Sequence, residues 1–201
     1  MIAVIDYGAG NLFSVCNALK YLNIPHEVTK DAAAVNAADA VILPGVGAFP
    51  AAMRDLAATG LVDTVRQNAK KKPLLGICLG MQMLFDDSDE MGGAAGLGLI
   101  SGTVRRIPSE NVIIPHMGWN ELVITQESRL LSGIETPLYT YFVHSYQAFC
   151  ADESIIAYAD YDGRIPALVT DGAFVFGAQF HPEKSGDRGL QMLRNFEELS
   201  K

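Results

Sequence analysis

The chain has 201 residues, of which 49% are hydrophobic, and its formal net charge is −8 at pH 7. This length and composition predict one folded domain over residues 1–201 and exclude a disordered chain. The acidic balance argues against nucleic acid as the main partner, because such affinity comes largely from basic groups that meet phosphates.

The sequence carries no signal for export or for a membrane. It has no run of 18 apolar residues, and it opens on a strand pattern without a basic region or a cleavage site. Three widely spaced cysteines fit a reducing compartment and argue against a disulfide framework or a zinc site: Cys16, Cys78 and Cys150. We therefore expect a cytoplasmic protein with no metal and no organic cofactor.

The first hundred residues alternate between strand and helix patterns. The expected strands are 2–6, 26–29, 40–44 and 73–78, and the expected helices are 11–22, 32–37, 51–57, 61–71 and 79–86. Asn11 is positioned to cap the first helix, whose apolar residues recur at helical spacing. The alternation predicts parallel strands with helices on both faces, and catalytic loops at the carboxyl ends of those strands.

The second half of the chain is rich in strand patterns. We expect strands at 99–107, 112–115, 121–125, 139–144, 155–159, 165–170 and 174–180. The dipeptides Asp162-Gly163 and Asp171-Gly172 suit tight hairpin turns between the last three strands. A final helix at 186–199 is expected to pack back on the sheet, and no interdomain linker interrupts the pattern.

The segment Gly76-Ile77-Cys78-Leu79-Gly80 joins an expected strand to an expected helix. A nucleophile flanked by glycines two residues away, between strand and helix, is typical of a nucleophile elbow, here with Cys in place of Ser. The glycines are needed because backbone crowds this strained turn. The following helix N-terminus favours the thiolate form of Cys78. Taken alone, Cys78 could also be an inert buried thiol.

His181 and Glu183 follow the last expected strand and supply the other parts of a thiol acyl-transfer site. His181 would accept the proton of Cys78 and pass it to the leaving group, while Glu183 orients the imidazole and favours its charged form. Pro182 between them has a fixed φ that would stiffen the pair. The His-Pro-Glu spacing alone also fits an ordinary surface or core histidine.

Acyl transfer also needs two donors for the oxyanion of the tetrahedral intermediate. The backbone N–H of Leu79, directly after the nucleophile, is the expected first donor. The loop Pro44-Gly45-Val46-Gly47 follows another strand, and we assign the second donor to its Val46–Gly47 region. A plain turn between strand and helix is the alternative for this loop.

Together these segments resemble the class I (triad) glutamine amidotransferases. The matching stretches are Pro44-Gly45-Val46-Gly47, Gly76-Ile77-Cys78-Leu79-Gly80-Met81-Gln82 and Phe180-His181-Pro182-Glu183. Two others narrow the resemblance to the glutaminase subunits of imidazole glycerol phosphate synthase: His116-Met117-Gly118-Trp119-Asn120 and Tyr141-Phe142-Val143-His144-Ser145-Tyr146. The resemblance covers essentially the whole chain and implies a three-layer α/β/α fold around an open, twisted, mixed and mostly parallel sheet.

The resemblance implies a reaction and a partner. Glutamine would be hydrolysed to glutamate and ammonia through a γ-glutamyl thioester on Cys78, with Gln82 and the backbone around Ser145 and Tyr146 holding the substrate. The ammonia would pass within a heterodimer to a (β/α)8-barrel cyclase of histidine biosynthesis, which forms imidazole glycerol phosphate and aminoimidazole carboxamide ribotide. The resemblance places His116, Met117 and Trp119 at the active-site mouth facing the cyclase. We also expect Asn11, in the loop after the first strand, to lie near that interface, and Lys184, directly after the triad, to pair with an acid of the partner.

Other activities fit parts of the same pattern. The chain could be the glutaminase subunit of another synthase, a cysteine hydrolase or peptidase of the same fold, or a non-catalytic subunit whose cleft only binds. The glycines of the oxyanion loop would allow an unproductive peptide orientation until a partner docks, so we expect weak turnover by the isolated chain.

Three loops are predicted to carry no separate site. Gly8-Ala9-Gly10-Asn11 lacks the third glycine of a dinucleotide fingerprint, because that position is Phe13. The acidic run 86–90 lacks the spacing of a calcium loop and is expected to be a solvated segment. The glycine-rich stretch 91–98 is expected to form a surface loop.

Overall fold

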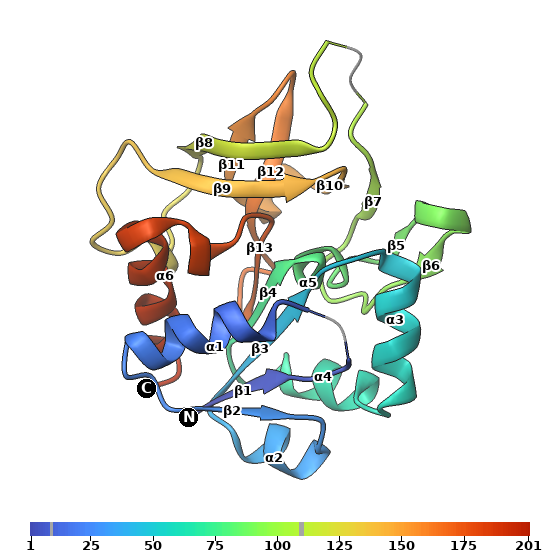
Figure 1. The fold of residues 1–201 in the computed structure, drawn as a ribbon, viewed down its shortest axis with the longest axis vertical. Coiled ribbons are helices and arrows are strands. Elements are labelled where there is room, and N and C mark those ends of the chain that lie inside the picture. Colours follow the sequence, from blue (N-terminus) through green and yellow to red (C-terminus); the bar gives the residue numbers. More distant parts are fainter. Residues whose placement is uncertain (9, 109–110) are drawn as a thin grey trace.

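A nine-stranded mixed sheet organises the computed structural model, which describes residues 1–8, 10–108 and 111–201 (Figure 1). Five parallel strands form one half of the sheet in the order β2 (His26–Thr29), β1 (Ile2–Ile5), β3 (Ala40–Gly45), β4 (Leu74–Cys78) and β13 (Val175–Ala178). Antiparallel strands continue it as β12 (Arg164–Thr170), β11 (Ile155–Asp160), β8 (His116–Ile124) and β9 (Tyr139–His144).

The central parallel strands are buried along their whole length. Every residue of β1, β3 and β4 is buried, which explains why the sequence reads there as continuous apolar runs rather than alternating ones. Since all these strands end at the same edge of the sheet, the residues after β3, β4 and β13 meet there.

Helices cover both faces of this sheet and give the three expected layers. One face packs against α1 (Leu12–Tyr21) and α6 (Gly186–Glu198), and the other against α2 (Ala32–Ala37), α3 (Phe49–Ala58) and α4 (Val62–Asn68). The side chain of Asn11 accepts from the N–H of Ser14 and caps α1, as predicted, and Asp31 caps α2 in the same way. Among the described residues, no helix is both long enough and apolar enough to cross a membrane.

The predicted helix over 79–86 is shorter than expected. Helix α5 spans only Leu79–Gln82. The N–H groups that would continue it take other acceptors: Leu84 and Phe85 donate three residues back, to Met81 and Gln82, and Asp86 donates to the distant Gly102. The helix therefore tightens in its last turn and stops before residue 86.

The predicted strand over 112–115 is wrong. Ile113 is 82% exposed, and Pro115 has no N–H to donate to a sheet, so the strand begins at His116. Strand β8 then runs without a break to Ile124 and includes all but the last residue of the expected 121–125 strand. The stretch His116–Asn120 therefore belongs to the sheet, and it pairs with β9 from His116 opposite His144 to Asn120 opposite Thr140.

A second, four-stranded sheet was not predicted. It contains β10 (Tyr146–Phe149), β7 (Thr103–Arg106), β5 (Asp87–Ser88) and β6 (Ala94–Ala95). The acidic run and the glycine-rich loop each contribute two residues to it, with the short helix η1 (Glu90–Gly92) between them. Two-residue strands carry no periodic signal, so only their pairing partners reveal them.

Candidate functional site

Cys78 lies at a nucleophile elbow between β4 and α5. Its backbone has φ 55° and ψ −112°, a conformation that non-glycine residues rarely adopt and that functional sites often retain. A Cβ on Gly80 would collide with the carbonyl group of Leu43, and one on Gly76 would lie 2.6 Å from the carbonyl oxygen of Gly80. The crowding inferred from the glycine spacing is therefore real.

His181 and Glu183 form a buried pair beyond the end of β13. The Nδ1 atom of His181 lies 2.8 Å from Oε1 of Glu183, with side chains 3% and 0% exposed. The backbone N–H of His181 donates to the carbonyl of Tyr141 on β9, and its carbonyl accepts from the hydroxyl of Ser185. The antiparallel half of the sheet thus fixes the histidine above the parallel half.

The charge on His181 depends on its two acidic neighbours. Burial alone would lower the pKa of this imidazole, but the charges of Cys78 and Glu183 and the hydrogen bond to Glu183 outweigh it and raise the pKa to about 9. Cys78 and His181 line the same cavity, and among the described residues Nε2 of His181 has no hydrogen-bond partner. Hydrogen bonds between catalytic groups commonly tighten only when substrate binds.

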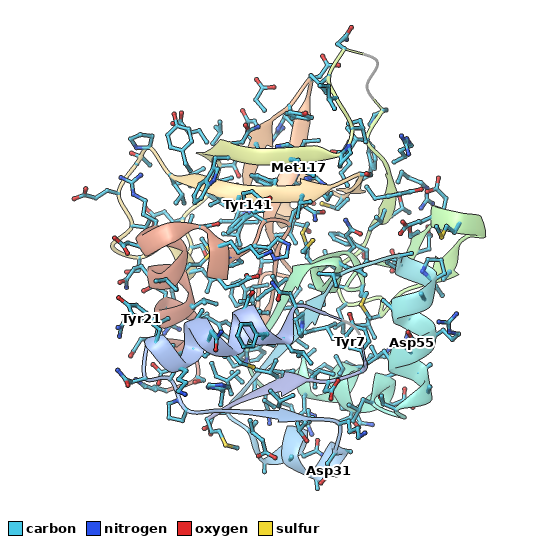
Figure 2. The ribbon with its side chains drawn as sticks, viewed as in Figure 1. Tyr7, Tyr21, Asp31, Asp55, Met117 and Tyr141 are labelled. Carbon is cyan, nitrogen blue, oxygen red and sulfur yellow. The ribbon has the colours of Figure 1, made fainter. Side chains whose placement is uncertain are left out.

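A cavity of about 400 Å³ opens beside the thiol and is large enough for an amino-acid substrate. The expected oxyanion residues Val46, Gly47 and Leu79 line it. Leu79 begins α5, so its N–H belongs to the first helical turn, where amides have no carbonyl partner within the helix. Tyr7, labelled in Figure 2, holds the start of the oxyanion loop by donating from its hydroxyl to the carbonyl of Pro44 at 2.9 Å.

The residues expected to hold the substrate also line this cavity: Gln82, Ser145 and Tyr146. Their carbonyl groups are partly committed elsewhere. The carbonyl of Tyr146 accepts from Nε2 of Gln82 at 3.0 Å and from Nδ1 of His144 at 2.8 Å, and that of Ser145 accepts from the N–H of Ile107. Atoms left for a substrate include the side-chain oxygen of Gln82 and the hydroxyl of Ser145.

Sequence reasoning missed three residues of the site: Glu90, His144 and Gln179. Glu90 lines the cavity and accepts from the N–H of Phe49 at 2.7 Å, although its acidic run suggested a solvated segment. His144 lines the cavity, and the amide of Gln179 approaches the thiol at 3.9 Å. His144 lies in the Tyr141–Tyr146 segment and Gln179 in the expected strand 174–180, but nothing in the sequence shows that their side chains turn inward.

Several residues expected to meet a partner form an exposed group on the sheet. Met117 and Trp119 on β8 are 59% and 53% exposed, and Figure 2 shows Met117 beside Tyr141 of β9. The rings of Trp119 and Tyr141 meet edge to face with centroids 6.0 Å apart, and Nζ of Lys184 lies 6.0 Å from the Tyr141 ring centroid. Asn11 caps helix α1, which packs against the segment carrying Lys184.

His116 departs from that expectation because it lies inside the protein. Its side chain is 1% exposed and stacks between Phe142 and Tyr161, with ring centroids 4.5 and 4.0 Å away. Burial lowers the pKa of His116 to about 4, which keeps the ring neutral at pH 7. A direct partner contact by this imidazole is therefore not available in the chain as it stands.

The family model described as "Glutamine amidotransferase class-I" matches residues 3–199. The chain belongs to the class-I glutamine amidotransferase family. This glutamine amidotransferase is 50% identical over 198 residues to "Imidazole glycerol phosphate synthase subunit HisH" of Bacillus cereus (strain G9842), covering 98% of this chain and 94% of the relative. It is 49% identical to the same subunit of Bacillus anthracis, covering 98% of this chain and 93% of the relative.

Solved structures agree on the fold of this glutamine amidotransferase. One described as a glutamine amidotransferase matches with a TM-score of 0.77 at 20% identity, covering 100% of this chain and 99% of that chain. PurLQS from Thermotoga maritima matches with a TM-score of 0.75 at 20% identity, covering 100% and 98%. The three-layer fold with a mixed sheet and a nucleophile elbow is confirmed, and so is the family that the motifs indicated.

The site of this amidotransferase is built from amino-acid side chains and backbone. In the part of the chain that the structure describes, no group of three or more His, Cys, Asp or Glu side chains could hold a metal ion.

Proposed function

We propose that this chain is the glutaminase subunit of an imidazole glycerol phosphate synthase. The observation that carries the proposal is the meeting of Cys78, His181 and Glu183 beside a cavity of about 400 Å³, in a chain 50% identical to a relative named as subunit HisH of imidazole glycerol phosphate synthase. Residues 1–201 act as one domain, in the cytoplasm and without a cofactor.

The three side chains divide the chemistry of hydrolysis. The thiolate of Cys78 attacks the side-chain amide carbon of glutamine, and the imidazolium of His181 protonates the amide nitrogen, which leaves as ammonia. The neutral imidazole then accepts a proton from water, which attacks the thioester, releases glutamate and frees the sulfur. Glu183 keeps the ring oriented and favours its charged form, as the raised pKa of His181 indicates.

Backbone amides stabilise the oxyanion that forms at each attack. Leu79 supplies one N–H and the Val46–Gly47 peptide the other, since both border the cavity beside the sulfur. Gln82, Ser145 and Tyr146 hold the rest of the substrate. Glu90 adds a carboxylate to this wall, which suits the α-ammonium group of a free amino acid.

The ammonia goes to a cyclase subunit with a (β/α)8 barrel, which forms imidazole glycerol phosphate and aminoimidazole carboxamide ribotide in the complex. We place the docking face at Met117, Trp119 and Lys184, with Asn11 at its margin. Two exposed apolar side chains and one cation close to the catalytic edge suit a protein partner. Transfer within the complex also protects ammonia from protonation in bulk water.

The test measures glutamate release from glutamine by the purified chain, alone and with a cyclase barrel and its ribotide substrate. We expect weak turnover alone and strong turnover in the full mixture, abolished by Cys78→Ala in a folded protein. Wild-type rates from Cys78→Ala would overturn the thioester mechanism. Equal turnover with and without the cyclase would assign the triad to a different amidotransferase.

A further inference from the structure

Gln179 is a buried polar residue whose side chain takes no part in the pairing of the strands. It follows β13 between Ala178 and Phe180, all three side chains are 0% exposed, and its backbone N–H already donates to Ala167. An apolar side chain would fill such a position without any polar group to satisfy. Burying a side-chain amide costs free energy unless its N–H and C=O groups form hydrogen bonds. The side-chain amide of Gln179 therefore needs a hydrogen-bond partner.

Its two side-chain contacts supply that partner. Oε1 of Gln179 accepts from Nε2 of Gln82 at 3.0 Å, and Nε2 of Gln179 lies 3.9 Å from Sγ of Cys78. The thiol itself lies 4.0 Å from the carbonyl oxygen of Val143. The sulfur therefore has one side-chain amide donor and one carbonyl acceptor beside it, in addition to His181.

The direction of these hydrogen bonds follows from a single carbonyl group. The oxygen of Tyr146 can only accept, so Gln82 must turn its NH₂ group toward it. The second proton of that NH₂ group then donates to Gln179 and requires Oε1 there. The NH₂ group of Gln179 is left facing the sulfur, and no flip of either amide preserves the chain of bonds.

A buried histidine, itself bonded to a second histidine, provides another donor to the same carbonyl. Nδ1 of His144 donates to Tyr146, which makes Nε2 of His144 the acceptor for Nδ1 of His116 at 2.9 Å. Burial lowers the pKa of His144 to about 3 and that of His116 to about 4, so both rings stay neutral at pH 7. The carbonyl that orients the glutamines is thus held by fixed donors.

We propose that Gln179 is a catalytic residue whose side-chain amide donates a hydrogen bond to the sulfur of Cys78 and stabilises its thiolate. The bond matters mainly for the ionised sulfur, because hydrogen bonds to charged acceptors are shorter and about twice as strong as neutral ones. The proton leaves Cys78 for Nε2 of His181, and Gln179 neither gains nor loses one. When the thioester breaks, the same amide receives the sulfur as it regains its charge.

The test replaces Gln179 with Met, which keeps the length of the side chain and removes the donor. The rate of iodoacetamide attack on Cys78 is followed against pH by peptide mass spectrometry, which separates Cys78 from Cys16 and Cys150. We expect Gln179→Met to lower the rate at neutral pH about tenfold and to move the pH midpoint up by about one unit. An unchanged midpoint in a folded variant would overturn the proposal.

Gln147→Met is the matched control. Gln147 is a second buried glutamine, 5% exposed on β10, and its side-chain oxygen has no hydrogen-bond partner among the residues that the structure describes. The same chemical change there should leave the midpoint in place. An equal shift in both variants would mean that any buried glutamine matters to packing alone, and would also overturn the proposal.

If Gln179→Met does not fold, the proposal can be tested on the wild-type chain by following its side-chain amide signals in nuclear magnetic resonance spectra against pH. The side-chain NH₂ signals of Gln179 should move with the same pH midpoint as the alkylation of Cys78, and signals that do not move would overturn the proposal. The inference rests on the proposed function only in one respect, which is that the thiolate stabilised by Gln179 takes part in glutamine hydrolysis. A chain that hydrolyses no glutamine but shows the alkylation shift would refute the glutaminase and leave the thiolate contact standing.

Discussion

Glu183 is the neighbour of His181 that can be neutralised with little change of shape. Glu183→Gln keeps an oxygen near Nδ1 but removes its negative charge, which favours the imidazolium and helps to raise the pKa of His181 to about 9. The imidazolium should then lose its proton at lower pH. We expect the alkaline limb of kcat/KM for glutamine to fall roughly one pH unit lower than in the wild type.

The pH–rate profile, recorded with the cyclase present, checks this prediction. Glu198→Gln on α6 removes an exposed carboxylate and should leave the limb where it is. A limb that stays near its wild-type position in Glu183→Gln would show that the charge of Glu183 does not control His181.

Glu90 offers a second prediction for a single residue. Glu90→Gln retains an acceptor for the N–H of Phe49 and removes the charge that faces the cavity. If the carboxylate binds the α-ammonium group equally in substrate and transition state, KM should rise about tenfold or more while kcat changes little. Steady-state glutaminase kinetics measure both, with Asp89→Asn as the neighbouring control. A loss confined to kcat would contradict the binding role.

The nucleophile elbow depends on close packing among three elements, because β3, β4 and α5 meet at Gly80. Gly80→Ala would drive a methyl group into the carbonyl of Leu43, which cannot move without disturbing β3. We expect urea unfolding to report a loss of about 1–3 kcal/mol or more. Gly133→Ala has open space around it and is the control, with only its positive φ opposing the substitution. Equal losses would mean that crowding at the elbow is relieved locally.

The assembly of elements explains why some strands were predicted and others were not. Strands β1, β3 and β4 are buried on both faces, and burial imposes an apolar run that is visible in the sequence. In β8 the exposed Met117 and Trp119 alternate with inward residues, so the pattern contains no simple apolar face. Its existence depends on pairing with β9, which lies more than a dozen residues further along the chain.

At the scale of the whole molecule, the exposed group on β8 and β9 should bind the cyclase. Trp119 is 53% exposed and contacts Tyr141 only at its edge, so Trp119→Ala should leave the free energy of unfolding nearly unchanged. An interface tryptophan commonly contributes 2 kcal/mol or more, which corresponds to about a 30-fold weaker complex. Titration calorimetry with the cyclase measures the effect.

Phe174→Ala is the matched control for this surface. Phe174 is also an exposed aromatic residue, 41% exposed, but it precedes β13 and lies at the opposite edge of the sheet from the catalytic loops. Its removal should not change affinity for the cyclase. Equal affinity of Trp119→Ala and the wild type would move the docking face elsewhere.

Much of the site was predictable because the sequence motifs that mark it consist of neighbouring residues. The glycines around Cys78, the His-Pro-Glu segment and the Pro-Gly-Val-Gly loop all follow short apolar strands, and parallel strands end at one edge of a sheet. A local backbone constraint leaves its mark on adjacent residues. The sequence by itself therefore determined the parallel half of the fold and the family, and it singled out Cys78, His181 and Glu183, which the structure brings together.

The tertiary structure alone decided which other side chains turn toward the sulfur. Glu90 reaches the cavity because the N–H of Phe49 holds it, Gln179 faces Cys78 because Gln82 and Tyr146 orient its amide, and His116 is buried between two rings. Each of these placements depends on partners 26 to 97 residues away in the chain or on the closing of a second sheet. Periodicity and spacing describe neighbours along the chain, so contacts made only on folding leave no pattern there.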